Sequence, residues 1–426
     1  MSHILEDFKS FLEASPTSWH AVREMANRLA LRDFSPLHEN EKWHLELGKK
    51  YFVIRGGSLC AFSLPKESVK KAVILASHTD SPALKLKPFP TFHVENMTLL
   101  RVEPYGAPLL TSWLNRDLIL AGRVVVTEGN GYVEEHLVYL DDAVCFIPQL
   151  APHLDREINE KGLVLNKHEH LCPIVGLTDV LGQEVNAVEK ILHRHLSFHT
   201  LLSFELFLVP REPPSFAGFN NELISSYRLD NLASAHAALS ALAVSQAAPN
   251  TVQMAIFWDN EEIGSRTKEG AASPFLQDTL TRIHHSTQGD LEEFFLLKHN
   301  SFCISVDVAH SLNPNYPKKY DPQHSPLLGK GIVIKQNADQ KYASNAFSAA
   351  IIMRACNMLN IPYQSYVNRS DIPSGSTVGP IVASETGITT IDIGCPQLSM
   401  HSIREVMATQ DYLDMYRLLA YLLQEA

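Results

Sequence analysis

The sequence predicts an α/β fold that is interrupted by an inserted β-rich domain. Short apolar runs, each ending at a histidine or an acidic residue, alternate with helical patterns in both flanks of the chain. Strands that alternate with helices form parallel sheets, and such sheets bind ligands at the carboxyl ends of their strands. We therefore expect the polar residues that follow these runs to mark the functional site.

Four apolar runs and two helical stretches make up the α/β pattern. The runs and the polar residues at their ends are KAVILASHTDSP with His78 and Asp80, VQMAIFWDNEE with Glu261 and Glu262, SFCISVDVAHS with Asp307 and His310, and GITTIDIGCP, which leads into QLSMHSIREV with His401. The helical stretches between them cover residues 231–246 and 344–359. This order places all of the polar residues at one rim of a single sheet.

The segment from about residue 91 to about residue 222 has a different pattern. Shorter β runs, such as DLILAGRVVV and LLSFELFLV, are separated by loops rich in Gly, Pro and charged residues. The segment VPREPPSFAGFNNE has the composition of a domain boundary, and the α/β pattern resumes at residue 223. We therefore expect one domain in two parts, 1–90 and 223–426, around an insert that covers residues 91–222.

Length, composition and charge exclude several classes of protein. At 426 residues the chain exceeds what one hydrophobic core usually supports. Its 45% hydrophobic and 19% charged residues are typical of a globular protein, and no apolar run reaches the roughly 18 residues of a membrane span. A net charge of −11 argues against a nucleic-acid surface, which needs clustered lysine and arginine. We expect neither nucleic-acid nor membrane partners.

The N-terminal segment and the cysteines indicate a cytoplasmic protein. Residues 1–30 carry charges throughout and lack the apolar stretch of a signal peptide; they are typical of two short amphipathic helices around SPTS. The six cysteines are scattered, without the paired spacing of a disulfide framework or a structural zinc site. We expect them to be reduced thiols.

Each candidate residue also has an explanation without function. Asp230 in RLDN precedes a helical stretch, where aspartate is a common N-cap. Asp307 could simply end a strand, and His401 could cap or flank the segment SIREV. The glutamates of NEE could lie in a solvated loop and interact with the dipole of the following turn. Single residues therefore decide nothing, and only the whole set indicates a function.

As a set, five of these residues suit two metal ions: His78, Asp230, Glu262, Asp307 and His401. Two imidazoles and three carboxylates match a pair of borderline divalent ions that share one bridging carboxylate. Asp80 follows His78 by two residues and could fix the tautomer of its imidazole. Of the two adjacent glutamates, we expect Glu262 to bind metal and Glu261 to act as the general base.

Together these motifs resemble those of the aspartyl aminopeptidase family of dinuclear zinc metallopeptidases. The resemblance rests, in order and approximate spacing, on SHTDSP, RLDN, DNEEIGS, SVDVAHSLNPNYP, VIKQNADQKYASN, SGSTVGP and PQLSMHSIRE, and it reaches into the insert through TSWLNRDLILAGRV. It implies a zinc-exopeptidase catalytic domain whose central sheet is mixed, largely parallel and flanked by helices. It also implies that the β-rich insert is a dimerisation domain.

The resemblance assigns the metal ligands and the reaction. It implies that one zinc ion is held by His78 and Asp307, the other by Glu262 and His401, and both by Asp230. The base role falls on the glutamate before Glu262, and manganese or cobalt could substitute for zinc. The implied reaction removes the N-terminal residue from peptides at neutral to mildly alkaline pH.

The resemblance also implies a substrate preference and an assembly. Lys335 matches a lysine near the substrate side chain, which implies acidic N-terminal residues, although some members of the family prefer neutral ones. His310 and Tyr342 are expected to contact the substrate. His153 matches a histidine that a neighbouring subunit contributes to the pocket, in dimers that assemble as a tetrahedral dodecamer. We therefore expect an obligate homo-oligomer built from dimers.

Two other functions stay open at this point. A deacylase or a carboxypeptidase could use the same dinuclear sheet, because related folds catalyse both reactions. A catalytically inactive scaffold could keep the fold for packing or binding alone. The presence of all five ligands and both glutamates argues against the inactive scaffold.

Overall fold

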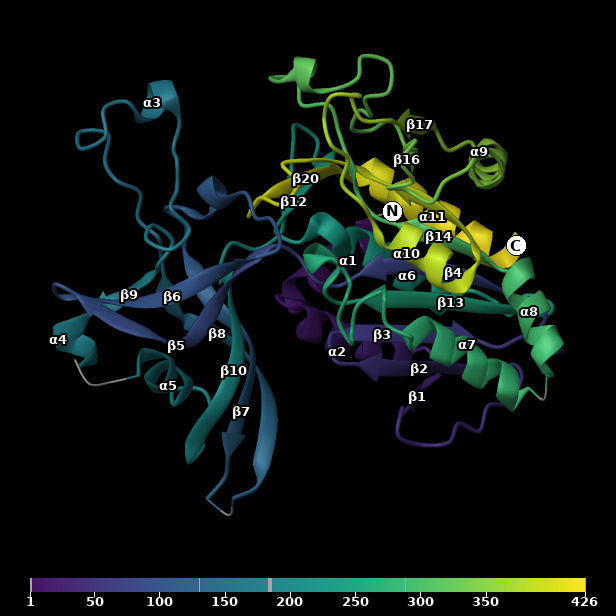
Figure 1. The fold of residues 1–426 in the computed structure, drawn as a ribbon, viewed down its shortest axis with the longest axis horizontal. Helices are drawn as coiled ribbons and strands as arrows, with labels where there is room; N and C mark the ends of the chain where they lie inside the picture. The colour runs from purple at the N-terminus through teal and green to yellow at the C-terminus, as the bar shows by residue number, and fades with distance from the viewer. Residues whose placement is uncertain (1, 130, 183–185, 288, 426) are drawn as a thin grey trace. The chain divides into compact units, whose positions relative to one another are not determined.

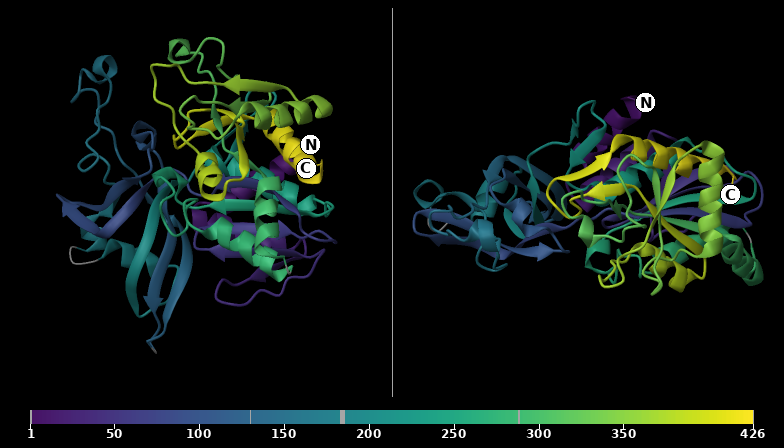
Figure 2. Two further views of the ribbon diagram at one scale, coloured as in Figure 1. Left: turned by 45° about the vertical axis from the view of Figure 1, so that its right-hand side comes forward. Right: turned by 90° about the horizontal axis from the view of Figure 1, so that it is seen from above.

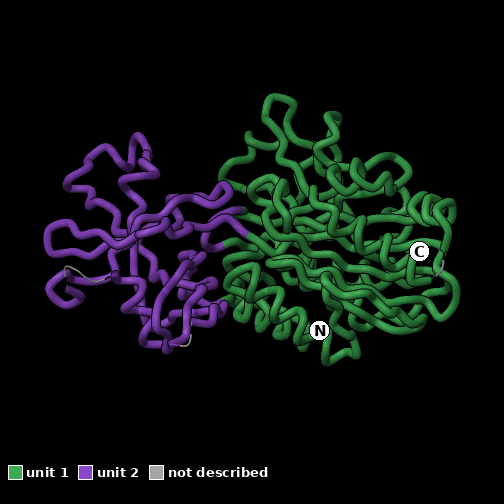
Figure 3. The backbone as a smooth tube through the Cα atoms, turned by 60° about the horizontal axis from the view of Figure 1, so that its bottom comes forward, with its two compact units in different colours: residues 1–80, 214–400, 405–426 green, residues 81–213, 401–404 purple. Residues whose placement is uncertain are grey.

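The chain forms two compact units, which Figure 3 draws in different colours. The structure is a computed structural model that describes residues 2–129, 131–182, 186–287 and 289–425. Unit 1 comprises residues 1–80, 214–400 and 405–426, and unit 2 comprises residues 81–213 and 401–404. Unit 2 and the expected insert, 91–222, therefore differ in their boundaries.

The first boundary follows from the pairing of one long strand. Strand β5 (Ala83–Val94) pairs antiparallel with β6 (Met97–Tyr105), first from Ala83 to Leu86 and again from Thr91 to Val94. Because both ends of β5 pair with the same neighbour, the unit begins before this strand rather than within it. The second boundary, after residue 213, lies in the segment with Pro and Gly residues that follows β10 (Thr200–Pro210).

A nine-stranded mixed sheet is the centre of unit 1 in the described chain (Figure 1). In spatial order its strands are β1 (Phe34–Leu37), β2 (Lys50–Arg55), β3 (Ser58–Ser63), β13 (Thr251–Trp258), β4 (Lys71–His78), β14 (Phe302–Val306), β18 (Thr389–Gly394), β16 (Ile332–Lys335) and β17 (Tyr363–Tyr366). Among these described strands, the four central ones, β13, β4, β14 and β18, run parallel to one another. The predicted α/β fold is thus confirmed.

Helices cover both faces of this sheet because its strands are apolar on both sides (Figure 2). In β4, Val73 and Leu75 face one core, and Ala72, Ile74 and Ala76 face the other, as the period of two in a strand requires. The first core is packed by α1 (Ser2–Ala14), α2 (Ser18–Ala30), α6 (Leu229–Val244), α9 (Ala346–Leu359) and α11 (Thr409–Glu425). The second is packed by α7 (Phe275–Ser286), α8 (Leu291–Asn300) and α10 (Val378–Thr386).

A smaller sheet extends unit 1 beside the central strands. Its described strands are, in order, β11 (Ser215–Ala217), β12 (Leu223–Ser226), β20 (Glu405–Ala408), β19 (Pro396–Leu398) and β15 (Ala309–His310). β15 follows β14 in the chain, and β19 follows β18. The two sheets are therefore linked by the segments that leave the carboxyl ends of the central strands.

Unit 2 is built on an antiparallel sheet. Its described strands are, in order, β8 (Val133–Cys145), β7 (Leu118–Thr127), β10, β5, β6 and β9 (Ile174–Leu177), and its short helices are η1 (Leu110–Trp113), α3 (Ile158–Lys161), α4 (Thr178–Leu181) and α5 (Ala187–Leu192). Gly122 of β7 lies so close to β10 that a Cβ there would be 2.0 Å from the backbone oxygen of Glu205. A glycine is therefore required at this point of the sheet.

The six cysteines are all free thiols in the described chain, and only Cys172 has a partly exposed side chain. Cys172 lies in unit 2, next to the start of β9. Among the helices described, none combines the length and the apolar character that crossing a membrane requires.

Candidate metal centre

Parallel pairing brings most of the predicted site residues to one edge of the nine-stranded sheet. β13 and β4 pair up to their last residues, Trp258 and His78, and β14 runs parallel to β4 on its other side. The 3₁₀ helix η2 (Glu261–Ile263) follows β13, and Asp307 directly follows β14. Because parallel strands end at the same edge, these side chains meet there.

Three residues of this edge form a group with the spacing of metal ligands. His78, Asp230 and Glu262 each offer one ligand atom, and these atoms lie within 4.8 Å of one another. The Nε2 atom of His78 is 3.3 Å from Oδ1 of Asp230 and 3.8 Å from Oδ1 of Asp307. The same nitrogen is 3.9 Å from Oε2 of Glu261. One imidazole nitrogen therefore faces three carboxylates.

Asp80 contacts both the other side of this imidazole and the turn that carries the glutamates. The Nδ1 atom of His78 lies 3.1 Å from the backbone oxygen of Asp80 and 3.4 Å from its Oδ1. The backbone N–H groups of Glu261 and Glu262 donate to Oδ1 and Oδ2 of Asp80, at 3.0 and 3.1 Å. A single buried carboxylate thus orients the histidine and holds the η2 turn.

The start of helix α6 presents Asp230 to the group. Asp230 and Asn231 have non-helical backbone angles, so the regular helical backbone of α6 begins after them. The backbone N–H of Asp230 donates to Oε2 of Glu405, at 2.9 Å. Next to it, the Asn231 amide donates to Ser77 Oγ in β4 and to the backbone oxygen of Val306 in β14. These bonds fix the helix start to the ends of both strands.

Close packing of the backbone fixes the position of Asp307. Its N–H donates to the backbone oxygen of Ile393 in β18, at 2.9 Å. A Cβ on the next residue, Gly394, would lie 1.8 Å from the backbone oxygen of Asp307. Glycine is therefore needed at 394 for the chain after β14 to approach β18.

The acidic residues of the group are buried among one another, which shifts their titration. Burial is the largest cause that raises the pKa of Glu261; His78 lowers the pKa, Asp307, Asp80 and Asp230 raise it, and the result is about 8. Burial, followed by the charges of Asp230 and Glu261, holds the pKa of Glu262 well above its ordinary value. Burial lowers the pKa of His78, but its contacts with Asp230 and other carboxylates outweigh this and raise the pKa well above the ordinary value.

The group fits zinc by the chemistry of its donors. One imidazole nitrogen and several carboxylate oxygens are the ligands that zinc takes in catalytic sites. Buried carboxylates that face one another repel, and a divalent cation between them removes this repulsion. Burial raises the pKa values of Glu261 and Glu262 most, and the charges of the neighbouring acids raise them as well. The residues present therefore fit the metal that the sequence predicts.

The predicted substrate residues Lys335, Tyr342 and His310 lie in unit 1, in one chain of contacts. The Lys335 side chain is only 3% exposed, and its Nζ lies 3.5 Å from Oδ2 of Asp307 and 5.4 Å from the ring centre of Tyr342. Burial lowers the pKa of Lys335, but the charge of Asp307 and its neighbours leaves it above the ordinary value. The Tyr366 ring lies between those of Tyr342 and His310, at 6.3 and 6.1 Å.

Two predicted residues, His401 and His153, belong to unit 2 and not to unit 1. His401 is the first residue of the segment 401–404, and its Nδ1 lies 3.1 Å from the backbone oxygen of Ala107 in the same unit. His401 has a φ of 66°, a left-handed conformation. His153 is exposed in the loop between β8 and α3. Their roles as a zinc ligand and as a contribution to a neighbouring subunit stay predictions.

Sequence reasoning overlooked two residues of this region. Glu405 is buried and accepts the backbone N–H of Asp230, although it stands four positions after His401 in the quoted motif. Tyr366 contacts both predicted substrate residues with aromatic rings. A buried acid in an apolar strand was a signal for Glu405, whereas nothing in the sequence around Tyr366 set it apart.

The chain matches the model of one protein family, described as "Aminopeptidase I zinc metalloprotease (M18)", over residues 11–422. It is similar to a probable M18 family aminopeptidase 2 of Clostridium acetobutylicum, at 42% identity over 410 residues that cover 95% of this chain and 94% of the relative. It is also similar to a probable aspartyl aminopeptidase of Ricinus communis, at 36% identity over 450 residues that cover 95% and 92% of the two chains.

Solved structures agree with the family match. A chain in the cryo-EM structure of the Ape4 and Nbr1 complex has a TM-score of 0.92 and 35% identity, covering 98% of this chain and 85% of that one. An M18 aminopeptidase from Thermotoga maritima has a TM-score of 0.88 and 28% identity, covering 100% and 96%. The mApe1 dodecamer of S. cerevisiae has a TM-score of 0.83 and 26% identity, covering 98% and 95%.

These matches cover nearly the whole chain, including both units. They confirm the resemblance to the aspartyl aminopeptidases, the fold, and the assignment as a metal-dependent hydrolase. The protein belongs to the M18 family of zinc aminopeptidases.

Proposed function

We propose that this aminopeptidase removes Asp or Glu from the N-terminus of peptides and uses two zinc ions per subunit. The observation that carries the proposal is the group of His78, Asp230 and Glu262, with Glu261 beside it. The residues that would hold the ions are His78 and Asp307 for one, Glu262 and His401 for the other, and Asp230 for both. Manganese or cobalt could replace zinc at these ligands.

Proton transfer and positioning in this reaction are assigned to residues of the chain. Zinc, when bound, polarises the scissile carbonyl and makes water more acidic. Glu261 lies next to the ligand group with a side chain that is 15% exposed, so its carboxylate is close to the ligands and also reaches solvent. Glu261 takes a proton from the attacking water and gives it to the leaving amine. Asp80 is a positioning residue, since it holds His78 and the backbone of both glutamates.

The acidic preference is supported by a buried positive charge. Lys335 is the cation beside Asp307, and an acidic substrate side chain near it would gain a charge-assisted hydrogen bond. Tyr342 and His310 would contact the same substrate side chain. Tyr342 lies beside Lys335, and the Tyr366 ring connects Tyr342 to His310. The Ricinus communis relative carries the name aspartyl aminopeptidase, whereas the bacterial relatives carry only the family name. A preference for neutral residues is therefore the alternative.

A panel of substrates tests the reaction and the preference together. We expect Asp- and Glu-aminoacyl fluorogenic substrates to be cleaved faster than Leu- and Ala-aminoacyl ones, and an N-acetylated Asp substrate to be inert. Faster cleavage of the Leu substrate would replace the acidic preference by the neutral one. Cleavage of the acetylated substrate would instead indicate a deacylase. Zinc analysis of the active protein is expected to give two ions per subunit.

The assembly proposed is a homo-oligomer of dimers, in which His153 completes the pocket of its partner. Apolar side chains near His153 in the sequence are exposed: Leu150 and Leu154 in the same loop are 55% and 75% exposed, and Val164 after α3 is 86% exposed. Exposed apolar clusters are typical of protein interfaces. The similar mApe1 structure is a dodecamer, and a tetrahedral dodecamer is the expected state here.

Subunit exchange tests the shared pocket. Glu261→Ala and His153→Ala proteins would each be inactive or weakly active, and mixed dimers would pair an intact catalytic group with an intact histidine. Activity after verified exchange should exceed the sum of the two parents. No recovery, or full activity of a stable monomer, would remove the shared pocket and leave the zinc chemistry untouched.

We also propose a cytoplasmic location. All six cysteines are thiols in the described chain, and five of them are buried. Proteins of oxidising compartments commonly use such residues in disulfides. Fractionation of cells that express a tagged chain would test this location, and recovery outside the cytoplasmic fraction would contradict it.

A further inference from the structure

A cavity lies at the edge of the nine-stranded sheet opposite to the candidate metal centre. It has a volume of about 300 Å³, and its lining includes Lys71, Phe302 and Thr389. These are the first residues of β4, β14 and β18. His78 is the last residue of β4, so seven residue steps of extended chain, roughly 23 Å, separate it from Lys71. The cavity is therefore distinct from the metal centre.

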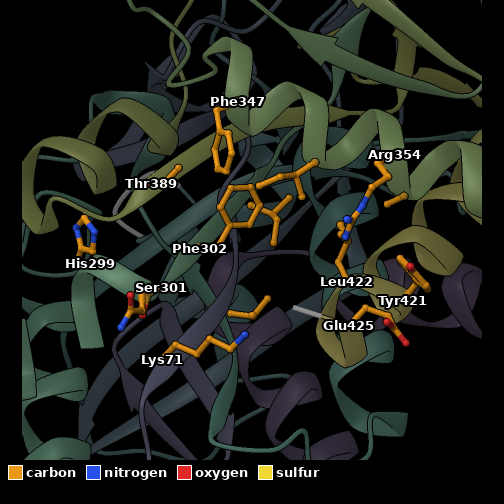
Figure 4. A pocket seen from close by; sticks show the side chains of 15 residues that line it. Lys71, His299, Ser301, Phe302, Phe347, Arg354, Thr389, Tyr421, Leu422 and Glu425 are labelled. Carbon is orange, nitrogen blue, oxygen red and sulfur yellow. The ribbon is translucent and has the colours of Figure 1, made fainter. Parts of the chain in front are cut away.

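The inner wall of the cavity is apolar. Val73 and Ile304 are fully or almost fully buried, and Leu422 of α11 is 5% exposed. Figure 4 shows the ring of Phe302 near the middle of the lining, with Phe347 of α9 next to it. Phe347 is 71% exposed, so an aromatic ring is left at the mouth. Apolar walls of this kind bind apolar parts of small ligands.

Charges of both signs line the same cavity. Lys71 comes from β4, Arg354 from α9 and Glu425 from α11, and Figure 4 shows all three side chains in the lining. Among the described residues, none of these three side chains makes a hydrogen bond or an ion pair. Their ionic groups are therefore available to a ligand that carries both charges.

We propose that this cavity binds a free amino acid with an apolar side chain. Arg354 and Lys71 receive the carboxylate, Glu425 receives the ammonium group, and the side chain packs against Phe302 and Leu422. The volume is at the lower end for ligand pockets, which suits a single amino acid better than a peptide. The site does not depend on the acidic preference or on the number of metal ions.

Three ligands with five or six carbon atoms separate the contribution of the ligand's carboxylate from that of its ammonium group. Norleucine carries both charges, hexanoate lacks the amine, and pentylamine lacks the carboxylate. Calorimetric titration of the zinc-loaded enzyme is expected to rank them in that order. Equal binding of norleucine and hexanoate would overturn the amino-acid assignment, because the site would then recognise only a carboxylate on an apolar chain.

Variants of the charged residues that line the cavity test whether norleucine binds there. Arg354→Met should weaken norleucine binding by about tenfold or more, because a charge-assisted bond is lost. Glu425→Gln should weaken norleucine but leave hexanoate unchanged. Arg32→Met is the matched control, since Arg32 is an exposed arginine of unit 1 whose side chain has no partner among the described residues. An Arg354→Met protein that binds norleucine like the wild type would overturn the proposal.

A crystallographic measurement checks the site without any substitution. Free selenomethionine is an amino acid with an apolar side chain, and its selenium gives an anomalous signal. Crystals of the zinc-loaded enzyme soaked with it should show a selenium peak between Phe302 and Leu422. A peak only near the metal centre, or no peak while calorimetry shows binding, would overturn the assignment to this cavity.

Discussion

Acidic side chains lie in partly or fully buried positions in both units, but their surroundings are opposite. In unit 2, Glu205 of β10 accepts hydrogen bonds from Lys85, at 2.8 Å, and from Arg123, at 2.7 Å. In unit 1, Glu261 has one histidine and several carboxylates as its charged neighbours. Partial burial raises the pKa of Glu205, but its two cations outweigh this and hold it below the ordinary value. For Glu261 burial and the other acids raise the pKa to about 8.

The difference teaches where the protein uses its acids for structure and where it holds them for a cation. Buried acids cost stability unless a partner compensates the charge. Glu205 lies between two cations, whereas the charged neighbours of Glu262 are one histidine and several carboxylates. An M18 enzyme binds zinc, which adds positive charge to such a group. Acids gathered at the ends of neighbouring strands are therefore a better guide to the metal centre than the number of acids.

Removing the charge of Glu261 should have the largest effect on activity. Glu261→Gln keeps the shape of the side chain and abolishes its basicity, so kcat should fall about 10³-fold, within the range for general bases. Bound zinc should stay unchanged, because Glu261 is not among the proposed ligands. Glu205→Gln is the control and should keep full kcat. Undiminished hydrolysis by Glu261→Gln would refute its role as the base.

The pH dependence of stability in the zinc-free protein should differ between wild type and Glu261→Gln. The folded chain holds a proton on Glu261 up to about pH 8, whereas an unfolded glutamate releases it near 4.5. This contribution to stability is complete below 4.5 and is lost as the pH rises through 8. Zinc-free Glu261→Gln should therefore match the wild type near pH 5 and exceed it at pH 8.5, by an amount on the order of a few kcal/mol. Thermal unfolding would measure the difference in stability between the two proteins at each pH. A difference that does not change with pH would contradict the raised pKa.

Lys335 is a buried cation beside Asp307, and removing it should change selectivity. Lys335→Met keeps an apolar stem and removes the charge, so the ratio of kcat/KM for Asp over Leu substrates should fall about tenfold. Zinc content must be measured as well, because Lys335 also contacts Asp307. If zinc is retained and the ratio is unchanged, Lys335 has no part in selecting the substrate.

Breaking the ion pairs of Glu205 should have the smallest effect. Arg123→Met removes a partner of a carboxylate that is 35% exposed, where ion pairs contribute about 0.2–1 kcal/mol. We expect a lower free energy of unfolding by that amount and unchanged kcat/KM. Denaturant unfolding and the Asp substrate measure both quantities. A loss of activity would mean that this pair does more than stabilise unit 2.

Much of the fold could be predicted because its signals are local. The apolar runs that end at His78 and Asp307 are strands of the central sheet, and the helical stretch after RLDN is α6. Parallel strands end at one edge, so the meeting of these polar residues followed from the fold class alone. The boundaries of the insert were harder to predict, because β5 continues across the expected start at residue 91, although its pairing with β6 shifts between Leu86 and Thr91.

The remaining parts of the site depend on contacts between distant segments. Asp80 was expected to orient His78, but its bonds to Glu261 and Glu262 join positions about 180 residues apart, which no spacing rule reveals. The bond from Asp230 to Glu405 is of the same kind. Patterns with periods of two or 3.6 residues report which face of an element is buried, and they carry no information on such pairs.

The accessibility of the thiols makes this protein convenient for site-specific labelling. Maleimide reagents attack exposed thiolates, and of the six cysteines in the described chain only Cys172 is partly exposed. Burial raises the pKa of Cys172, so the label would attach faster at mildly alkaline pH. A fluorophore would therefore mark unit 2 at a single position without any engineered cysteine. Two differently labelled batches, once mixed, would report subunit exchange by energy transfer, which is the verification that the complementation experiment requires.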